Sequence, residues 1–135
     1  SIAELVETYL RELDAVLGEL PKACHELGAI FQGERPEEGY EPFHHLAEIW
    51  REVKSRESIV AEALHLALDT FDLDGVPLTQ LHTELNGYLA EAAEALQAND
   101  CVLLGDLLEY ELAPRAENEA KIVALLREQA RKRAG

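Results

Sequence analysis

The sequence predicts an all-α protein, an antiparallel up-and-down bundle of four main helices with kinks at Pro21 and Pro114. Apolar residues recur every three or four positions along most of the chain, as on amphipathic helices. Leu and Ala dominate the apolar content and favour helices, whereas strand-favouring Val and Ile are few. The connections between the four apolar stripes are short, which favours antiparallel neighbours. The 135 residues suit a single domain over 1–135.

The first stripe begins at the start of the chain. Ser1 is a candidate N-cap, with Glu4 three residues on as in a capping box. Pro21 interrupts the stripe, although the apolar spacing continues to Phe31. The pattern therefore fits either one long helix kinked at Pro21 or a helix to about Leu20 followed by a second, short helix.

The remaining elements follow from turn residues and further stripes. Residues 33–42 hold two Gly, two Pro and four Glu, which predicts a loop with a helical turn begun by Pro36. A long helix is expected from about Glu41 to Phe71, then a turn over 72–75. The third helix starts at Pro77, and Asp100 is a good N-cap for the last helix, in which Pro114 lies.

The charge of the chain argues against several classes of partner. Twelve Lys and Arg face twenty-seven Asp and Glu, for a net charge of −15. Nucleic acids and anionic membranes would be repelled, so neither is expected as a partner. Four basic residues, Arg127, Arg131, Lys132 and Arg133, suit the negative end of the last helix dipole, or a docking tail for an acidic partner. With no signal peptide or transmembrane run visible, a cytoplasmic protein with reduced thiols is expected.

Several short motifs resemble catalytic or metal sites but lack essential parts. Residues 69–75 resemble a calcium loop, yet position twelve of that loop would be Leu81. Residues 62–65 match the Glu-x-x-His element of di-iron bundles, which need two such elements. Cys24 and His25 are neighbours and would diverge by about 100° on a helix. The sequence thus predicts no metal, no cofactor and no enzyme activity.

The last helix carries an acidic residue at an apolar position. If that helix is regular, Glu111 falls within about 20° of the core direction set by Leu104, Leu108 and Ile122. A buried carboxylate needs a partner, and Arg115 one turn on is the nearest candidate. Other candidates are the hydroxyl groups of Tyr9 and Tyr88 and the carbonyl near Tyr110, which Pro114 leaves without an amide donor. Glu57 has a similar position on the second helix.

These inward acids have three interpretations. They form a polar layer that fixes the register of the helices. Alternatively, Pro114 shifts the phase of the last helix, so that Glu111 lies at the rim. In the third interpretation, they form a site for a small cationic or hydrogen-bonding ligand, with Glu57, Glu111, Arg115 and Tyr110 as its candidate binding residues.

The run Asp106-Leu107-Leu108-Glu109-Tyr110-Glu111-Leu112, followed by Pro114, resembles a C-terminal motif of small uncharacterised bacterial all-helical proteins. The resemblance implies a helical bundle. It also suggests that Asp106, Glu109, Tyr110 and Glu111 belong together.

Two functions fit these observations. The first is a non-enzymatic protein-interaction, regulatory or chaperone-like bundle that binds a protein partner or self-associates as a homodimer. Trp50, Tyr40 and Phe43 could form an exposed anchor for a partner, although Trp50 and Phe43 fit the core better. The alternative is a small-molecule- or metal-binding bundle with a buried acidic site.

Overall fold

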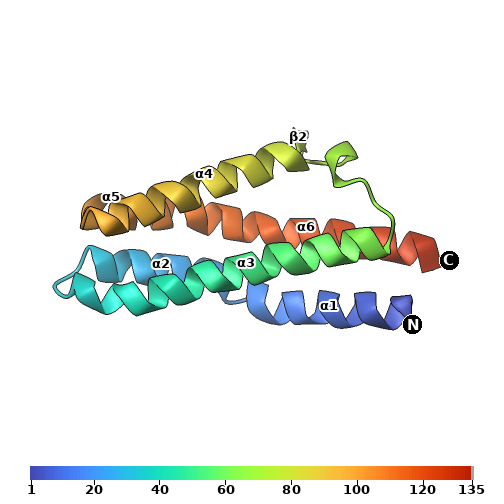
Figure 1. Ribbon diagram of the computed structural model, residues 1–135, viewed down its shortest axis with the longest axis horizontal. Coiled ribbons are helices and arrows are strands. Elements are labelled where there is room, and N and C mark those ends of the chain that lie inside the picture. Colours follow the sequence, from blue (N-terminus) through green and yellow to red (C-terminus); the bar gives the residue numbers. More distant parts are fainter. Residues whose placement is uncertain (135) are drawn as a thin grey trace.

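The computed structural model describes residues 1–134 and confirms the all-α class (Figure 1). Its α-helices are α1 (Ile2–Leu17), α2 (Leu20–Phe31), α3 (Tyr40–Ala63), α4 (Leu78–Gln97), α5 (Cys101–Asp106) and α6 (Ala113–Ala134). A π-helix, η3 (Leu107–Leu112), joins α5 to α6. Two 3-10 helices, η1 (Pro36–Gly39) and η2 (Leu68–Thr70), and the strands β1 (Asp72–Leu73) and β2 (Val76–Pro77) complete the described chain.

The long helices lie side by side and successive ones reverse direction (Figure 1). α1 and α2 follow one another along one side of the molecule, and α3 runs back beside them. α6 packs on both α1 and α2, while α4 packs mainly on α5 and η3. The first turns of α4 rest instead on η2 and β2, so this end of α4 is set apart from α6. Trp50 of α3 is fully buried and is the largest side chain of the core.

The first apolar stripe forms two helices. Ser1 caps α1 and accepts a hydrogen bond from the Glu4 amide at 3.3 Å, as predicted. α1 ends at Leu17, and α2 begins at Leu20 with Pro21 in its first turn. A first-turn proline is tolerated because its missing N–H has no partner within the helix. The second of the two expected arrangements is therefore the one found.

The long helix α3 is shorter than its stripe suggested. It begins at Tyr40 directly after η1, close to the expected Glu41, but it ends at Ala63 and not at Phe71. His65 stops it by adopting a positive φ of 56°. The predicted turn at 72–75 is the tip of a β-hairpin in which Asp74 and Gly75 have φ of 52° and 84°, as in a type I′ turn. The composition argument had not predicted this small sheet.

The connection from α4 to α5 matches its prediction. α4 follows Pro77 directly, and Asp100 caps α5 by accepting a hydrogen bond from the Leu103 amide at 3.1 Å. None of the helices described here is both long enough and apolar enough to cross a membrane.

The last stripe is interrupted by the π-helix η3. Pro114 has no N–H to donate to the carbonyl of Tyr110, and its ring crowds that carbonyl. The amide of Ala113 bonds to the carbonyl of Leu108, five residues back, which is the π pattern. This wider turn changes the direction in which the surrounding side chains point. Leu107, Leu108 and Leu112 are buried, as are Ala113 and Ala116 after them.

Candidate binding site

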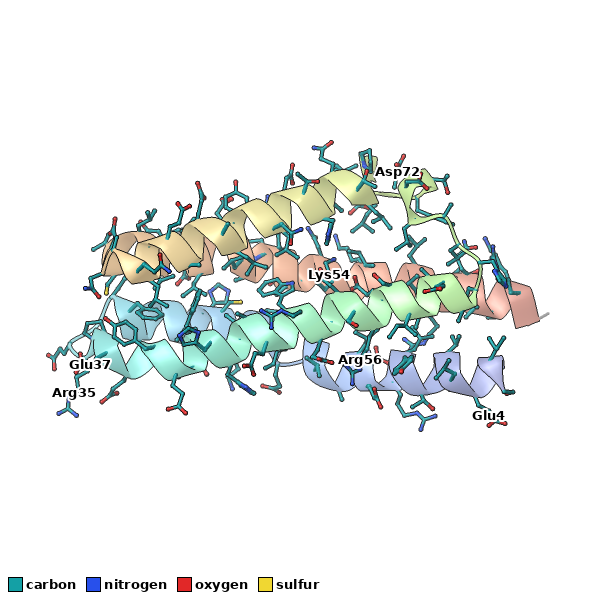
Figure 2. All side chains as sticks on the ribbon, viewed as in Figure 1. Glu4, Arg35, Glu37, Lys54, Arg56 and Asp72 are labelled. Atoms are coloured by element: carbon teal, nitrogen blue, oxygen red, sulfur yellow. The ribbon has the colours of Figure 1, made fainter. Side chains whose placement is uncertain are left out.

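A lysine and two glutamates meet between α3 and α6. Lys54 lies on α3, facing α6 (Figure 2). Its Nζ is 3.1 Å from Oε1 of Glu57, one turn on along α3, and 2.6 Å from Oε1 of Glu119 on α6. Only 5% of Glu57 and 2% of Glu119 is exposed, so both acids are part of the protein interior. We call these three residues the buried cluster.

The buried cluster has more acidic groups than basic ones. Burial raises the pKa of Glu57 well above its usual range, and the neighbouring carboxyl group of Glu119 raises it further. Burial lowers the pKa of Lys54, but the carboxylates of Glu57 and Glu119 outweigh that effect and raise it overall. Glu57 therefore holds a proton more tightly than an exposed glutamate does, while Lys54 stays charged.

Each acid of the buried cluster also has an oxygen without a donor. Oε2 of Glu57 and Oε2 of Glu119 are buried and accept no hydrogen bond from residues 1–134. A buried acceptor without a donor costs about 1–3 kcal/mol. A proton on one carboxyl group would let it donate a hydrogen bond to a neighbouring carboxylate.

A cavity of about 380 Å³ opens beside Glu57. It lies where the first turns of α4 are set apart from α6, and Lys54 and Glu57 contribute its charged wall. Its apolar wall consists of Leu68, Leu78, Ile122 and Leu126. Ser58, Thr79, His82 and Thr83 are exposed and form the polar mouth. The volume is within the range of about 300–1,000 Å³ typical of small-molecule sites.

A second polar group lies one to two turns away along α6. Arg115 contacts Oε2 of Glu111 at 3.3 Å and Oε2 of Glu84, on α4, at 3.4 Å. The guanidinium carbon of Arg115 lies 4.3 Å from the ring centre of Tyr88, a cation–π distance. The hydrogen bond with Glu111 raises the pKa of the Tyr88 hydroxyl. This group is half-exposed and ties α4 to α6.

The structure does not bring the four predicted site residues together in one site. Glu57 is buried, as expected, and Arg115 contacts Glu111, also as expected. Glu111 does not point into the core, because 33% of its side chain is exposed. The π turn shifts the phase of the helix and moves Glu111 to the rim, so the second interpretation of this acid is the one observed. Tyr110 is 69% exposed and contributes nothing to the buried cluster.

Sequence reasoning missed Glu119 and Lys54. Glu119 precedes Ile122, Val123 and Leu126 by three, four and seven positions, which is the spacing of one helix face. All three of those residues are buried. Had the stripe been counted from α6 alone, it would have placed Glu119 inside. Lys54, one turn before Glu57, would then have been the expected basic partner of both acids.

The residues of the C-terminal motif contact different neighbours. Asp106 accepts a hydrogen bond from Gln32, the residue after α2, at 3.0 Å, and Glu109 lies 3.0 Å from Nδ1 of His25. Tyr110 faces solvent and Glu111 contacts Arg115. The motif therefore joins α2, α4 and α6 and does not form one site.

The metal-like sequence motifs have structural explanations. Over residues 1–134, no three His, Cys, Asp or Glu side chains gather closely enough to hold a metal ion. Asp74 of the calcium-like loop pairs with Lys121 at 3.2 Å. Glu62 and His65 are both exposed.

Comparison with known proteins gives a family match. A family model described as "Domain of unknown function (DUF8042)" matches residues 8–121, a span that holds the whole buried cluster and the π-helix. No curated protein and no solved structure matches the chain.

Proposed function

This chain belongs to the DUF8042 family, a domain of unknown function, and from its own surface we propose that it is a non-enzymatic protein-interaction module. The observation that carries the proposal is a set of exposed apolar side chains near one end of the bundle. Val102, Leu103 and Tyr110 are 68%, 45% and 69% exposed along α5 and η3. Tyr40 adds to this surface, because its hydroxyl donates to Asn99, just before α5, at 2.9 Å. We call these four residues the end patch.

The end patch differs from the anchor that the sequence suggested. Trp50 and Phe43 are buried in the core, and only Tyr40 of the three expected residues is exposed. Large apolar side chains on a surface are typical of interaction sites when they gather in one place. Three of the four residues belong to one continuous helical segment, which would present them to a partner together.

The charge around the end patch indicates the chemistry of the partner. Residues 98–114 contain four acidic and no basic residues. A partner segment with apolar and basic side chains, such as an amphipathic helix, would match this surface. A second copy would bring the same acids against it, in a molecule whose net charge is −15. We therefore propose a basic protein segment as the occupant, in place of the homodimer expected from sequence.

The test uses a designed amphipathic Leu/Lys helix as the probe, with a Leu/Glu helix of the same length as its control. We expect the Leu/Lys peptide to bind, with an affinity that falls as salt is added, when followed by fluorescence anisotropy. The double variant Val102→Ser/Tyr110→Ser should weaken binding by at least about tenfold. These positions are exposed, so the variant should keep its stability within about 0.5 kcal/mol.

The matched control is Ile2→Ser/Leu5→Ser, which removes two exposed apolar side chains from α1. This variant should bind like the original protein. Equal binding of the Leu/Glu peptide would contradict the charge argument, and equal loss in both variants would contradict the location. Light scattering that shows a dimer dissociated by the end-patch variant would identify a second copy as the occupant and overturn the proposed basic partner.

A second candidate function is small-molecule binding. The cavity beside Glu57 favours it, because Glu57, whose buried Oε2 has no donor among the described residues, contributes to the wall of a largely apolar space of ligand size. Ligands that bind there should raise the melting temperature of the protein. No rise across a panel of cationic, neutral and anionic small molecules would contradict this candidate.

A further inference from the structure

We propose that the cavity beside Glu57 binds a small organic cation, an ammonium group on an apolar body, which replaces a proton on the Glu57 carboxyl group. The inference rests on the second candidate function and specifies its ligand. It concerns a different part of the molecule from the end patch.

The charge balance of the buried cluster is the first step. The ammonium group of Lys54 lies within hydrogen-bond distance of the carboxyl groups of both Glu57 and Glu119. When both acids are ionised, the cluster carries one negative charge more than Lys54 can neutralise. Buried charges need partners, so the cluster requires one further positive charge or one proton. Both Oε2 atoms without donors are the structural sign of this deficit.

Glu57 is the acid that contributes to the wall of the cavity. Glu119 is not among the residues lining that cavity and borders a separate space of about 10 Å³. Lys54 also lies closer to Glu119 than to Glu57, at 2.6 Å against 3.1 Å. Lys54 can therefore remain with Glu119 while a second cation binds Glu57.

The other charged groups described around the cavity do not supply the missing positive charge beside Glu57. From α4, His82 lies at the mouth and contacts Asn86 at 3.1 Å. From α6, Arg115 borders the small space beside Glu119, but it is held by Glu84 and Glu111. η2 contributes the apolar Leu68.

The remaining residues that line the cavity favour a particular kind of nonpolar group on the ligand. Leu78, Ile122 and Leu126 form walls that favour an aliphatic or aromatic group over a hydrated metal ion. A carboxylate ligand would be repelled by Glu57 and Glu119. The hydroxyl groups of Ser58 and Thr79 at the mouth can accept the remaining ammonium hydrogens.

The exchange balances in protons and charge. The ligand enters as R–NH3⁺ and keeps its three protons. Glu57 changes from the neutral acid to the carboxylate, and its proton passes to the buffer. Binding at a pH where Glu57 is protonated should thus release about one proton per ligand.

The probes are hexylamine, 1-hexanol and hexanoate, which share one apolar body and differ in charge. We expect hexylamine to bind at least about tenfold more tightly than 1-hexanol, and hexanoate to bind least, by isothermal titration calorimetry. Titrations at about pH 5.5 in acetate and in MES, whose ionisation enthalpies differ, should report about one released proton.

Glu57→Gln is the decisive variant, because the amide resembles the protonated acid in shape and charge and should allow folding. It should reduce hexylamine affinity by at least about tenfold and abolish proton release, while 1-hexanol binding is retained. Glu62→Gln, which removes an exposed acid from the same helix, should leave all three titrations unchanged. Thr79→Trp, at the mouth, should weaken every probe.

Each contrary result has a distinct meaning. If 1-hexanol binds as tightly as hexylamine, or if hexylamine binds without proton release, the cation inference is overturned while the cavity remains a ligand site. If Glu62→Gln lowers hexylamine affinity as much as Glu57→Gln, the attraction is a general effect of the acidic surface and the inference is overturned. If no probe binds, the second candidate function fails with it.

Discussion

Changing Glu57 to Gln should alter how the stability of the protein depends on pH. The folded protein holds a proton on Glu57 more tightly than the unfolded chain does, because burial and the neighbouring Glu119 raise the pKa of this carboxyl group. Between the unfolded value of about 4.5 and the folded value, the native state binds more protons than the unfolded state. Stability must therefore fall as the pH rises across this interval, which is opposite to the effect of a salt-bridged acid.

The size of the pH effect on stability follows from the titration of one proton, that on the Glu57 carboxyl group. The free energy of unfolding should fall by up to about 1.4 kcal/mol for each pH unit in this interval. Below the unfolded pKa both states are protonated, and above the folded pKa both are ionised, so the slope vanishes at either side. Glu57→Gln carries no titrating proton and should lack this contribution. The difference between the original protein and the variant isolates Glu57 from the many surface acids.

Urea unfolding between about pH 5 and pH 8 measures this difference. Trp50 is the only tryptophan and is fully buried, so its fluorescence reports unfolding of the core. Glu62→Gln, on the same helix but exposed, controls for the loss of one negative charge. Parallel stability curves for the original protein and Glu57→Gln would refute the reasoning, as would an equal change in slope for Glu62→Gln.

Three further changes test other parts of the structure. Lys54→Met leaves two buried carboxyl groups without their cation and should lower the free energy of unfolding in urea by about 3–5 kcal/mol. A loss below about 1 kcal/mol would contradict a buried ion cluster. Burial raises the pKa of the Cys24 thiol to about 12, so a disulfide reagent at about pH 8 should modify half-buried Cys101 at least about tenfold faster than Cys24 in the native protein. In urea the two thiols should react at equal rates, and equal rates in the native protein would contradict the burial of Cys24. Gly87→Ala, which places a methyl group in open space on α4, should add about 0.5–1 kcal/mol of stability and raise the melting temperature. Gly105→Ala should lower the melting temperature, because its methyl group would displace the side chain of Gln32. A change of the same sign in both variants would contradict this packing.

The predictions succeeded where each helix is uninterrupted. On α3, the spacing of Val53, Glu57 and Val60 placed the acid in the core, and no local signal disturbed that count. The caps at Ser1 and Asp100 were also found, because a short polar side chain before an apolar stripe forms a local hydrogen bond. Such features depend on a few consecutive residues and can be recognised without tertiary information.

The last helix shows why the candidate site could be predicted only in part. Counting 100° per residue through Pro114 placed Glu111 inside, whereas one π turn before that proline moves it to the rim. The same count obscured Glu119, which lies beyond the shift. Pro114 was visible in the sequence, but whether a helix accommodates a proline by bending or by forming a wider turn depends on packing against its neighbours. Here α2 approaches closely at Gly28 and Gly105, a contact between distant residues that local patterns do not encode.

The end of α3 illustrates a second limit. The apolar spacing continues from Leu64 to Phe71, and no Gly or Pro marks a stop. The chain leaves the helix at His65, which is not the Gly or Asn usual at a helix end, and Leu66, Leu68 and Phe71 pack against the core from the connection that includes η2. Those apolar side chains contact the core in either arrangement, so the sequence pattern could not distinguish a continued helix from this connection.

The wide turn before Pro114 also determines how this fold would respond to loss of a residue. A π turn holds about one residue more than an α turn, so deleting one position within 107–112 would allow an ordinary α-helix up to Pro114 in which the later side chains keep about their present direction. Glu119, Ile122 and Leu126 would then stay in the interior, whereas deleting one residue within 115–118 would rotate all three by about 100° relative to the preceding segment. A one-residue deletion in 107–112 should therefore be far less damaging than the same deletion in 115–118.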